Sequence, residues 1–152
     1  MLKKIIAPFL YFLLILILCS CMTLFPRQGG IQGHVYLIKG NQMPSPDIKP
    51  APPKGLATTI YIYELTNISQ VKQATRASFY STINAKLVKT VGSDENGSFK
   101  ISLAPGRYSL FIKKDDLFYA SIFDDKQNIA PVEVKRGSYT NVDIRADYDA
   151  IY

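Results

Sequence analysis

Short segments of alternating apolar and polar residues, separated by turn signals, constrain the fold of this chain more than any other feature. The clearest segment, TTIYIYEL at 58–65, is rich in β-branched and aromatic residues and predicts a strand. Turn-forming Gly, Pro, Asn and Asp recur between such segments about every 8–12 residues, which is typical of an antiparallel sandwich. We therefore expect an all-β fold, an antiparallel β-sandwich of seven to eight strands. The expected strands are 31–39, 58–65, 86–91, 98–103, 107–113, 117–123, 129–135 and 139–145.

One turn is well defined by its residues. Asp94-Glu95-Asn96-Gly97 predicts a hairpin turn, because glycine adopts a positive φ without strain. The oxygen-bearing side chains also raise the alternative of a calcium site. The spacing of an EF-hand is absent, so we expect these side chains to bind their own backbone instead. The strands that follow should direct four residues into the core: Phe99, Leu103, Tyr108 and Leu110.

Two segments interrupt the strand pattern. Residues 41–55 hold five of the nine prolines, and proline cannot donate to a sheet ladder, so an extended loop is expected there. Residues 67–85 are polar and contain neither Gly nor Pro. A loose apolar stripe from Val71 to Phe79, with Thr66 or Asn67 as a cap, favours a short helix or a structured loop over a strand.

The N-terminus has the parts of a secretory signal. Lys3 and Lys4 precede the uncharged segment 5–18, and the small residue Ser20 stands directly before Cys21. A transmembrane helix is the alternative, since about 20 apolar residues suffice to span a bilayer. The serine–cysteine pair favours the signal, because a spanning helix has no need of it.

The stretch Leu18-Cys19-Ser20-Cys21 resembles the lipobox of bacterial lipoproteins, with Cys21 as the lipidated residue. Cys19 fits less well, because Leu18 would then stand where a small residue is required. The resemblance implies a helical signal peptide at 1–20, a tether at 21–30 and palmitate on Cys21. No disulfide could form in the mature chain, so its domain would depend on a hydrophobic core.

The residues after Cys21 and the distribution of charge bear on where the protein is located and what it contacts. By the same resemblance, Met22 after the cysteine and the lack of acids before Asp47 imply an outer-membrane lipoprotein that faces the periplasm. Residues 21–114 hold 12 Lys and Arg against four acids, whereas 115–152 hold four against eight. We expect mostly solvated charges, with contact to anionic headgroups or polymers through one side as the alternative. The chain has no basic run with interleaved aromatic residues, so a nucleic-acid partner is not expected.

Two central motifs resemble the carboxypeptidase regulatory-like, or transthyretin-like, domain. GSDENGSF at 92–99 is similar to T-D-x-x-G-x-F, and LAPGRYSL at 103–110 is similar to L-x-P-G-x-Y-x-L. GIQGHV at 30–35 looks like the first strand of that family. The resemblance implies a transthyretin-like or Ig-like sandwich at 31–146, followed by a C-terminal tail at 147–152. It also implies a non-catalytic accessory module.

An enzyme is not expected, and neither is a cofactor or a metal. The chain has one histidine, no G-x-S-x-G motif and too few His and Cys residues for a zinc site. Transthyretin-like hydrolases end in Tyr-Arg-Gly-Ser. Here the segment Arg136-Gly137-Ser138 is internal and follows Lys135.

The expected function is that of a lipid-anchored accessory protein with a binding or structural sandwich. A surface-exposed glycan- or protein-binding module is the alternative. Its partners would be the membrane, through the N-terminal lipid, and an envelope protein or glycan. Arg and aromatic residues dominate interface energetics, but the same tyrosines could instead pack against the insertion. The candidate partner surface is Tyr61, Tyr63, Arg76, Phe79 and Tyr80.

Overall fold

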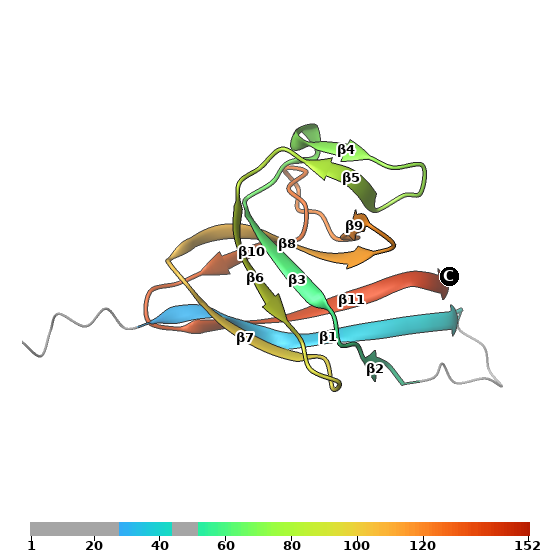
Figure 1. Ribbon diagram of the computed structural model, residues 1–152, viewed down its shortest axis with the longest axis horizontal. Coiled ribbons are helices and arrows are strands. Elements are labelled where there is room, and N and C mark those ends of the chain that lie inside the picture. Colours follow the sequence, from blue (N-terminus) through green and yellow to red (C-terminus); the bar gives the residue numbers. More distant parts are fainter. Residues whose placement is uncertain (1–27, 44–51) are drawn as a thin grey trace, which may run out of the picture.

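The computed structural model describes residues 28–43 and 52–152, and these form eleven strands and one 3-10 turn (Figure 1). The signal peptide, Cys21, the tether to residue 27 and the centre of the proline-rich loop (44–51) lie outside the described residues. The strands are β1 (Gly29–Asn41), β2 (Lys54–Gly55), β3 (Thr59–Glu64), β4 (Val71–Gln73), β5 (Phe79–Ile83), β6 (Leu87–Gly92), β7 (Ser98–Leu103), β8 (Gly106–Lys114), β9 (Leu117–Tyr119), β10 (Pro131–Val134) and β11 (Tyr139–Ile151).

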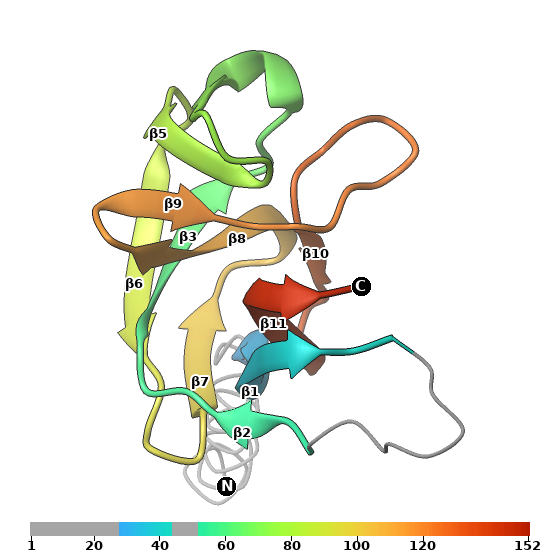
Figure 2. The same cartoon turned by 90° about the vertical axis from the view of Figure 1, so that its right-hand side faces the viewer.

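The strands form two packed sheets, which confirms the all-β sandwich (Figures 1 and 2). Sheet A contains β11, β1, β2 and β7, with β2 and β7 on the same side of β1. Sheet B contains β4, β5, β9, β8, β3 and β6 in that order, and β10 pairs with the first half of β8. The inner faces of both sheets enclose the main core. Its fully buried members include Ile31, Val35, Ile60, Ile62 and Ile112.

Strand β1 is central to sheet A, and its pairing with β11 is parallel. The register runs from Gly30 opposite Tyr139 to Asn41 opposite Ile151. This pair differs from the otherwise antiparallel pattern because it joins the first and last strands of the domain, which need no hairpin between them. Gly33 permits the close approach of the two strands, since a Cβ there would collide with the carbonyl of Val142.

The turn at residues 94–97 has the predicted geometry. Gly97 has a φ of +81°, and its amide donates to the Asp94 carbonyl at 2.9 Å. The Asp94 carboxylate accepts hydrogen bonds from the amides of Asn96 and Ser98, at 2.9 and 2.8 Å. The side chain thus caps its own turn. Gly97 also packs against β1, because a Cβ there would collide with the Val35 carbonyl.

A second motif residue secures the turn between β7 and β8. The hydroxyl of Tyr108 donates to the carbonyl of Ala104 at 2.9 Å, in the manner of the tyrosine corner of Ig-like sandwiches. The ring of the same tyrosine is buried in the core. All four residues predicted to face the core are buried: Phe99, Leu103, Tyr108 and Leu110.

Residues 67–85 form mainly strands, so the preference for a short helix or a structured loop over a strand is wrong. Asn67 does cap a turn, as predicted, but the turn is a single 3-10 turn (Ile68–Gln70). Strands β4 and β5 follow it as an antiparallel hairpin. Phe79 and Tyr80 of β5 pair with β9, which extends sheet B. The hydrogen bonds that decide between helix and strand therefore come from a distant segment, which the local pattern could not reveal.

The hairpin covers the second face of sheet B and encloses a smaller core. Strand β8 consequently has five consecutive buried residues, 108–112, instead of an alternating pattern. Phe111 is fully buried there, with edge-on contacts to Tyr63 and Tyr80 at ring distances of 5.6 and 5.9 Å. The inserted segment is therefore part of the folded core.

The last strand does not end at residue 145, and no separate tail occupies 147–152. Strand β11 continues to Ile151, paired with the second half of β1. A register shift falls between Ala146 and Asp149, where two residues of β11 face one of β1. Such a bulge bends the strand and redirects its side chains, here those of Asp147 and Tyr148.

A paired glycine substitution tests the role of the 94–97 turn. Gly97→Ala should destabilise the fold by at least 1–2 kcal/mol, roughly the cost of a left-handed backbone for an L-residue, with the clash at Val35 in addition. Gly92→Ala is the control, because open space surrounds its Cβ position. Urea unfolding of both variants gives the comparison. Equal stabilities would contradict this role for Gly97.

Candidate functional site

Three of the five residues predicted to form a partner surface are buried. Tyr80 is fully buried, and Phe79 and Tyr63 retain 3% and 8% of their exposure. Phe79 belongs to the main core, while Tyr63 and Tyr80 belong to the smaller one. The predicted surface is therefore wrong for these side chains. The alternative, that the tyrosines pack against the inserted hairpin, is the one the structure bears out.

The other two candidates also make contacts within the molecule. The Arg76 guanidinium donates to the Tyr148 carbonyl at 2.6 Å and lies 4.8 Å from the centre of the Phe79 ring. It thereby ties the hairpin to the bulge of β11. Tyr61 is half-buried, and the ammonium group of Lys113 lies 5.4 Å from its ring centre. Arg76 remains exposed and Tyr61 partly exposed, so their part in a partner surface stays a prediction.

A polar cluster that the sequence did not indicate surrounds Asp147. Its carboxylate accepts hydrogen bonds from the hydroxyls of Tyr119, at 2.6 Å, and Tyr152, at 2.8 Å. Ser121 adds a longer bond at 3.3 Å. Burial by itself would raise the pKa of Asp147, but these hydrogen bonds outweigh it and lower the pKa. Burial and the bond to Asp147 together raise the pKa of Tyr119.

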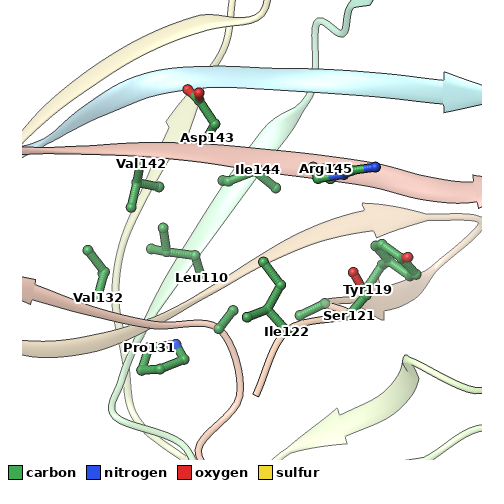
Figure 3. A pocket seen from close by; sticks show the side chains of 12 residues that line it. Leu110, Tyr119, Ser121, Ile122, Pro131, Val132, Val142, Asp143, Ile144 and Arg145 are labelled. Atoms are coloured by element: carbon green, nitrogen blue, oxygen red, sulfur yellow. The ribbon is translucent and has the colours of Figure 1, made fainter. Parts of the chain in front are cut away.

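A small cleft opens beside this cluster, between β11 and the segment that leads from β9 to β10 (Figure 3). Val142 points into it toward Leu110 and Val132, whereas Asp143 points to the opposite side of the strand. Its volume is about 80 Å³, against roughly 300–1,000 Å³ for ligand pockets. The cleft is a gap at the open edge of the sandwich, too small for a metabolite.

The outer face of sheet A carries polar side chains that are partly or fully exposed. Side chains from β7, β1 and β11 form successive rows across it, because neighbouring strands in register place their residues side by side. The Gln32 amide donates to the Asn141 side chain at 2.9 Å. In the next row, the Nδ1 atom of His34 lies 3.9 Å from the Asp143 carboxylate.

Aromatic rings border these rows. The rings of His34 and Tyr36 are stacked, with centres 5.6 Å apart. The Lys100 ammonium lies 4.3 Å from the centre of the Tyr139 ring. Between the rows lies a shallow hollow of about 420 Å³, whose polar lining residues are Gln32, His34, Ser98, Lys100, Asn141 and Asp143.

This face can offer planar amides, a carboxylate, an ammonium group and stacked rings to a ligand. Donors and acceptors are mixed, and Lys100 and Asp143 balance in charge, so the hollow suits a polar, uncharged molecule rich in hydroxyl groups. The sequence contained an indication of this polar face. The polar positions of the first and last predicted strands alternate with core positions, but only the pairing of β1 with β11 brings the two sets together.

Comparison with protein-family models, with curated proteins and with solved structures finds no match to this chain. Within residues 28–43 and 52–152, no helix is long and apolar enough to cross a membrane. The same residues contain no group of three or more His, Cys, Asp or Glu side chains placed to hold a metal ion.

The cluster around Asp147 predicts a loss of stability in acid. Its pKa is lower in the folded state than the ordinary 3.8, so the carboxylate stabilises the fold above that pH. The contribution declines as the pH falls through the folded pKa. Asp147→Asn should cost about 1 kcal/mol at pH 7, and the difference from wild type should shrink toward pH 3.

Chemical unfolding at several pH values measures this difference. Asp125→Asn is the matched control, because Asp125 is exposed and makes no side-chain hydrogen bond within the described residues. A gap between wild type and Asp147→Asn that stays constant from pH 7 to pH 3 would show that the carboxylate is not the stabilising group.

Proposed function

We propose that the chain is a lipid-anchored accessory protein of the bacterial envelope, acylated at Cys21 and held at the outer membrane, facing the periplasm. The observation that carries this proposal is the stretch 18–21, which follows an uncharged apolar segment and resembles a lipobox. The position of the sandwich supports it, since β1 begins at Gly29, shortly after the cysteine. Three acyl chains of a mature lipoprotein hold far more firmly than one, which gives only marginal binding.

A binding or structural role for the sandwich, of the carboxypeptidase regulatory-like kind, completes the proposal. Its support is the way the carboxylates are used. Asp94 caps a turn, and Asp147 accepts from two tyrosines. Asp124 accepts from the side chain and amide of Asn128 and pairs with Arg107 at 3.2 Å. These carboxylates stabilise turns and loops of the fold, so a transthyretin-like hydrolase is the less favoured hypothesis.

The anchor is tested by replacing the lipidated cysteine. Cys21→Ala should abolish the incorporation of labelled palmitate and leave an unprocessed precursor, or one processed elsewhere. Cys19→Ala is the matched control and should be acylated and retained in the membrane fraction like wild type. Palmitate entering the Cys21→Ala protein at the wild-type level would refute the lipobox assignment.

The second candidate function is a glycan-binding module, and the outer face of sheet A favours it. Hydroxyl-rich sugars are recognised by paired amides and carboxylates together with flat rings, and the rows on β1, β7 and β11 supply both. The hollow of about 420 Å³ lies within the size range of ligand sites. Surface exposure on the cell would place such a face toward external glycans, and a periplasmic position would place it toward the cell wall.

Purified peptidoglycan sacculi and a panel of neutral polysaccharides are suitable probes for this face. Asn141→Ala should weaken binding roughly tenfold, the equivalent of one hydrogen bond to the ligand. Asn84→Ala, an exposed asparagine in the inserted hairpin, should leave binding unchanged. Binding that is equally strong in both variants, or absent for every glycan, would remove this candidate.

A further inference from the structure

The end of the sandwich at which the chain enters carries an unpaired basic surface. Gly29, the first residue of β1, pairs with Leu103 at the end of β7. The backbone oxygens of Lys135 and Ser138 lie 2.6 and 2.8 Å from the position that a Cβ of Gly29 would take. The β7–β8 and β10–β11 turns therefore flank the entry point, at one end of the long axis (Figure 1).

Three cations lie at this end, which we call the basic pole: Lys89, Lys135 and Arg136. All three are exposed, and none forms an ion pair with any residue in 28–43 or 52–152. The Lys89 ammonium donates to the Ser102 carbonyl at 2.9 Å, which fixes it beside the entry point. A hollow of about 580 Å³ here is lined by both Lys89 and Arg136 and by no acidic residue.

Acidic residues gather away from this pole. The β8–β9 turn, toward the other end of the long axis, carries acids at 115 and 116, and Asp94 and Glu95 lie in the β6–β7 turn, beside the middle of β1 (Figure 1). Two lysines near the far end form ion pairs, Lys39 with Asp149 at 4.0 Å and Lys114 with Asp115 at 3.3 Å. Glu133, the acid nearest the basic pole in sequence, lies opposite Arg107 in the β8–β10 pairing. The acids of these two turns thus lie away from the end at which the chain enters, whereas the hollow of the basic pole has none in its lining.

We infer that the basic pole docks on anionic lipid headgroups and orients the sandwich upright on the membrane. This inference rests on the proposed anchor at Cys21. The seven residues 22–28 span at most about 25 Å, so the anchor keeps this end close to the headgroups. Each Lys or Arg near an anionic surface is worth about fivefold in binding, so the three together favour the docked orientation by about a hundredfold.

An anionic membrane fits the pole better than other occupants. Its three cations match phosphate-bearing headgroups in sign, whereas a neutral glycan would leave them unused. Electrostatic attraction between the pole and the headgroups extends about 8 Å at physiological salt, and the tether is short enough to keep the pole within that range. In the docked orientation the acidic β8–β9 turn lies away from the surface, where its repulsion from the headgroups is least.

The test uses the full mature protein in vesicles of phosphatidylcholine, with or without phosphatidylglycerol. The mature chain would have no free thiol, so Ser138→Cys at the pole and Ile151→Cys, exposed at the far end opposite Asn41, can each carry one fluorophore. A spin label on the lipid headgroup is the quencher. On anionic vesicles we expect the label at 138 to be quenched several-fold more than the label at 151. Neutral vesicles, or salt at about 1 M, should abolish the difference.

Matched charge reversals separate the pole from net charge. Lys89→Glu, Lys135→Glu and Arg136→Glu combined should remove the quenching difference. Lys54→Glu, Lys72→Glu and Lys126→Glu combined change the net charge equally at exposed positions elsewhere and should preserve it. Equal quenching of the two labels on anionic vesicles, or loss of the difference in both triple variants, would overturn the inference.

Mass spectrometry of the same preparations distinguishes the two proposals. A protein that carries acyl chains but shows no preferred orientation leaves the anchor standing and overturns the basic pole alone. A protein without acyl mass overturns the anchor, and the docking inference falls with it.

Discussion

The parallel pairing of β1 with β11 is the constraint on which the rest of the structure depends. It joins the first and last strands of the domain along almost their whole length, and β1 uses its other edge for β7 and β2. Sheet A is therefore incomplete until the last strand has been added. The close contact requires glycine at position 33, because any side chain there would meet the backbone of β11. The same pairing places the chain entry between two turns and so defines the basic pole.

Sheet B shows how an insertion becomes part of a core. Strand β8 is buried on both faces from Tyr108 to Ile112, and Phe111, on its second face, would be exposed in a sandwich of two bare sheets. The β4–β5 hairpin extends sheet B and curls over that face, where Tyr80 meets Phe111. Arg76 then fastens the turn of the hairpin to the backbone of β11. The sequence of this segment suggests an exposed insertion, but the segment is fixed by contacts with both sheet B and β11.

The faces of the two sheets consequently differ in what covers them. The middle of sheet B, around β8 and β3, has apolar packing on both faces, whereas the apolar packing of sheet A is on its inner face. The outer face of sheet A keeps rows of amides, charges and rings in contact with solvent. If the basic pole rests on the membrane, this face stands along the side of the molecule.

The sequence alone determined the strands that carry strong alternation, the 94–97 turn and the residues that face the main core. These features depend on local geometry: a period of two, a glycine with positive φ, and an aspartate that caps its own turn. The lipobox resemblance and the order of charges along the chain are likewise properties of the sequence. The sequence also held the residues of the outer polar face, although nothing local showed that they belong together.

Only the tertiary structure decided where the aromatic residues of 61–80 lie and whether 67–85 is helix or strand. The apolar residues of that segment are compatible both with a weak helical stripe and with a hairpin. The hydrogen bonds with β9 and the contact of Tyr80 with Phe111 of β8 decide for the strand, and both partners are more than 25 positions away. Long-range pairing also carried β11 beyond residue 145 and brought Asp147 to Tyr119. Burial is a property of the assembled sheets, so a tyrosine that looks available to a partner in the sequence can be the residue that closes the core.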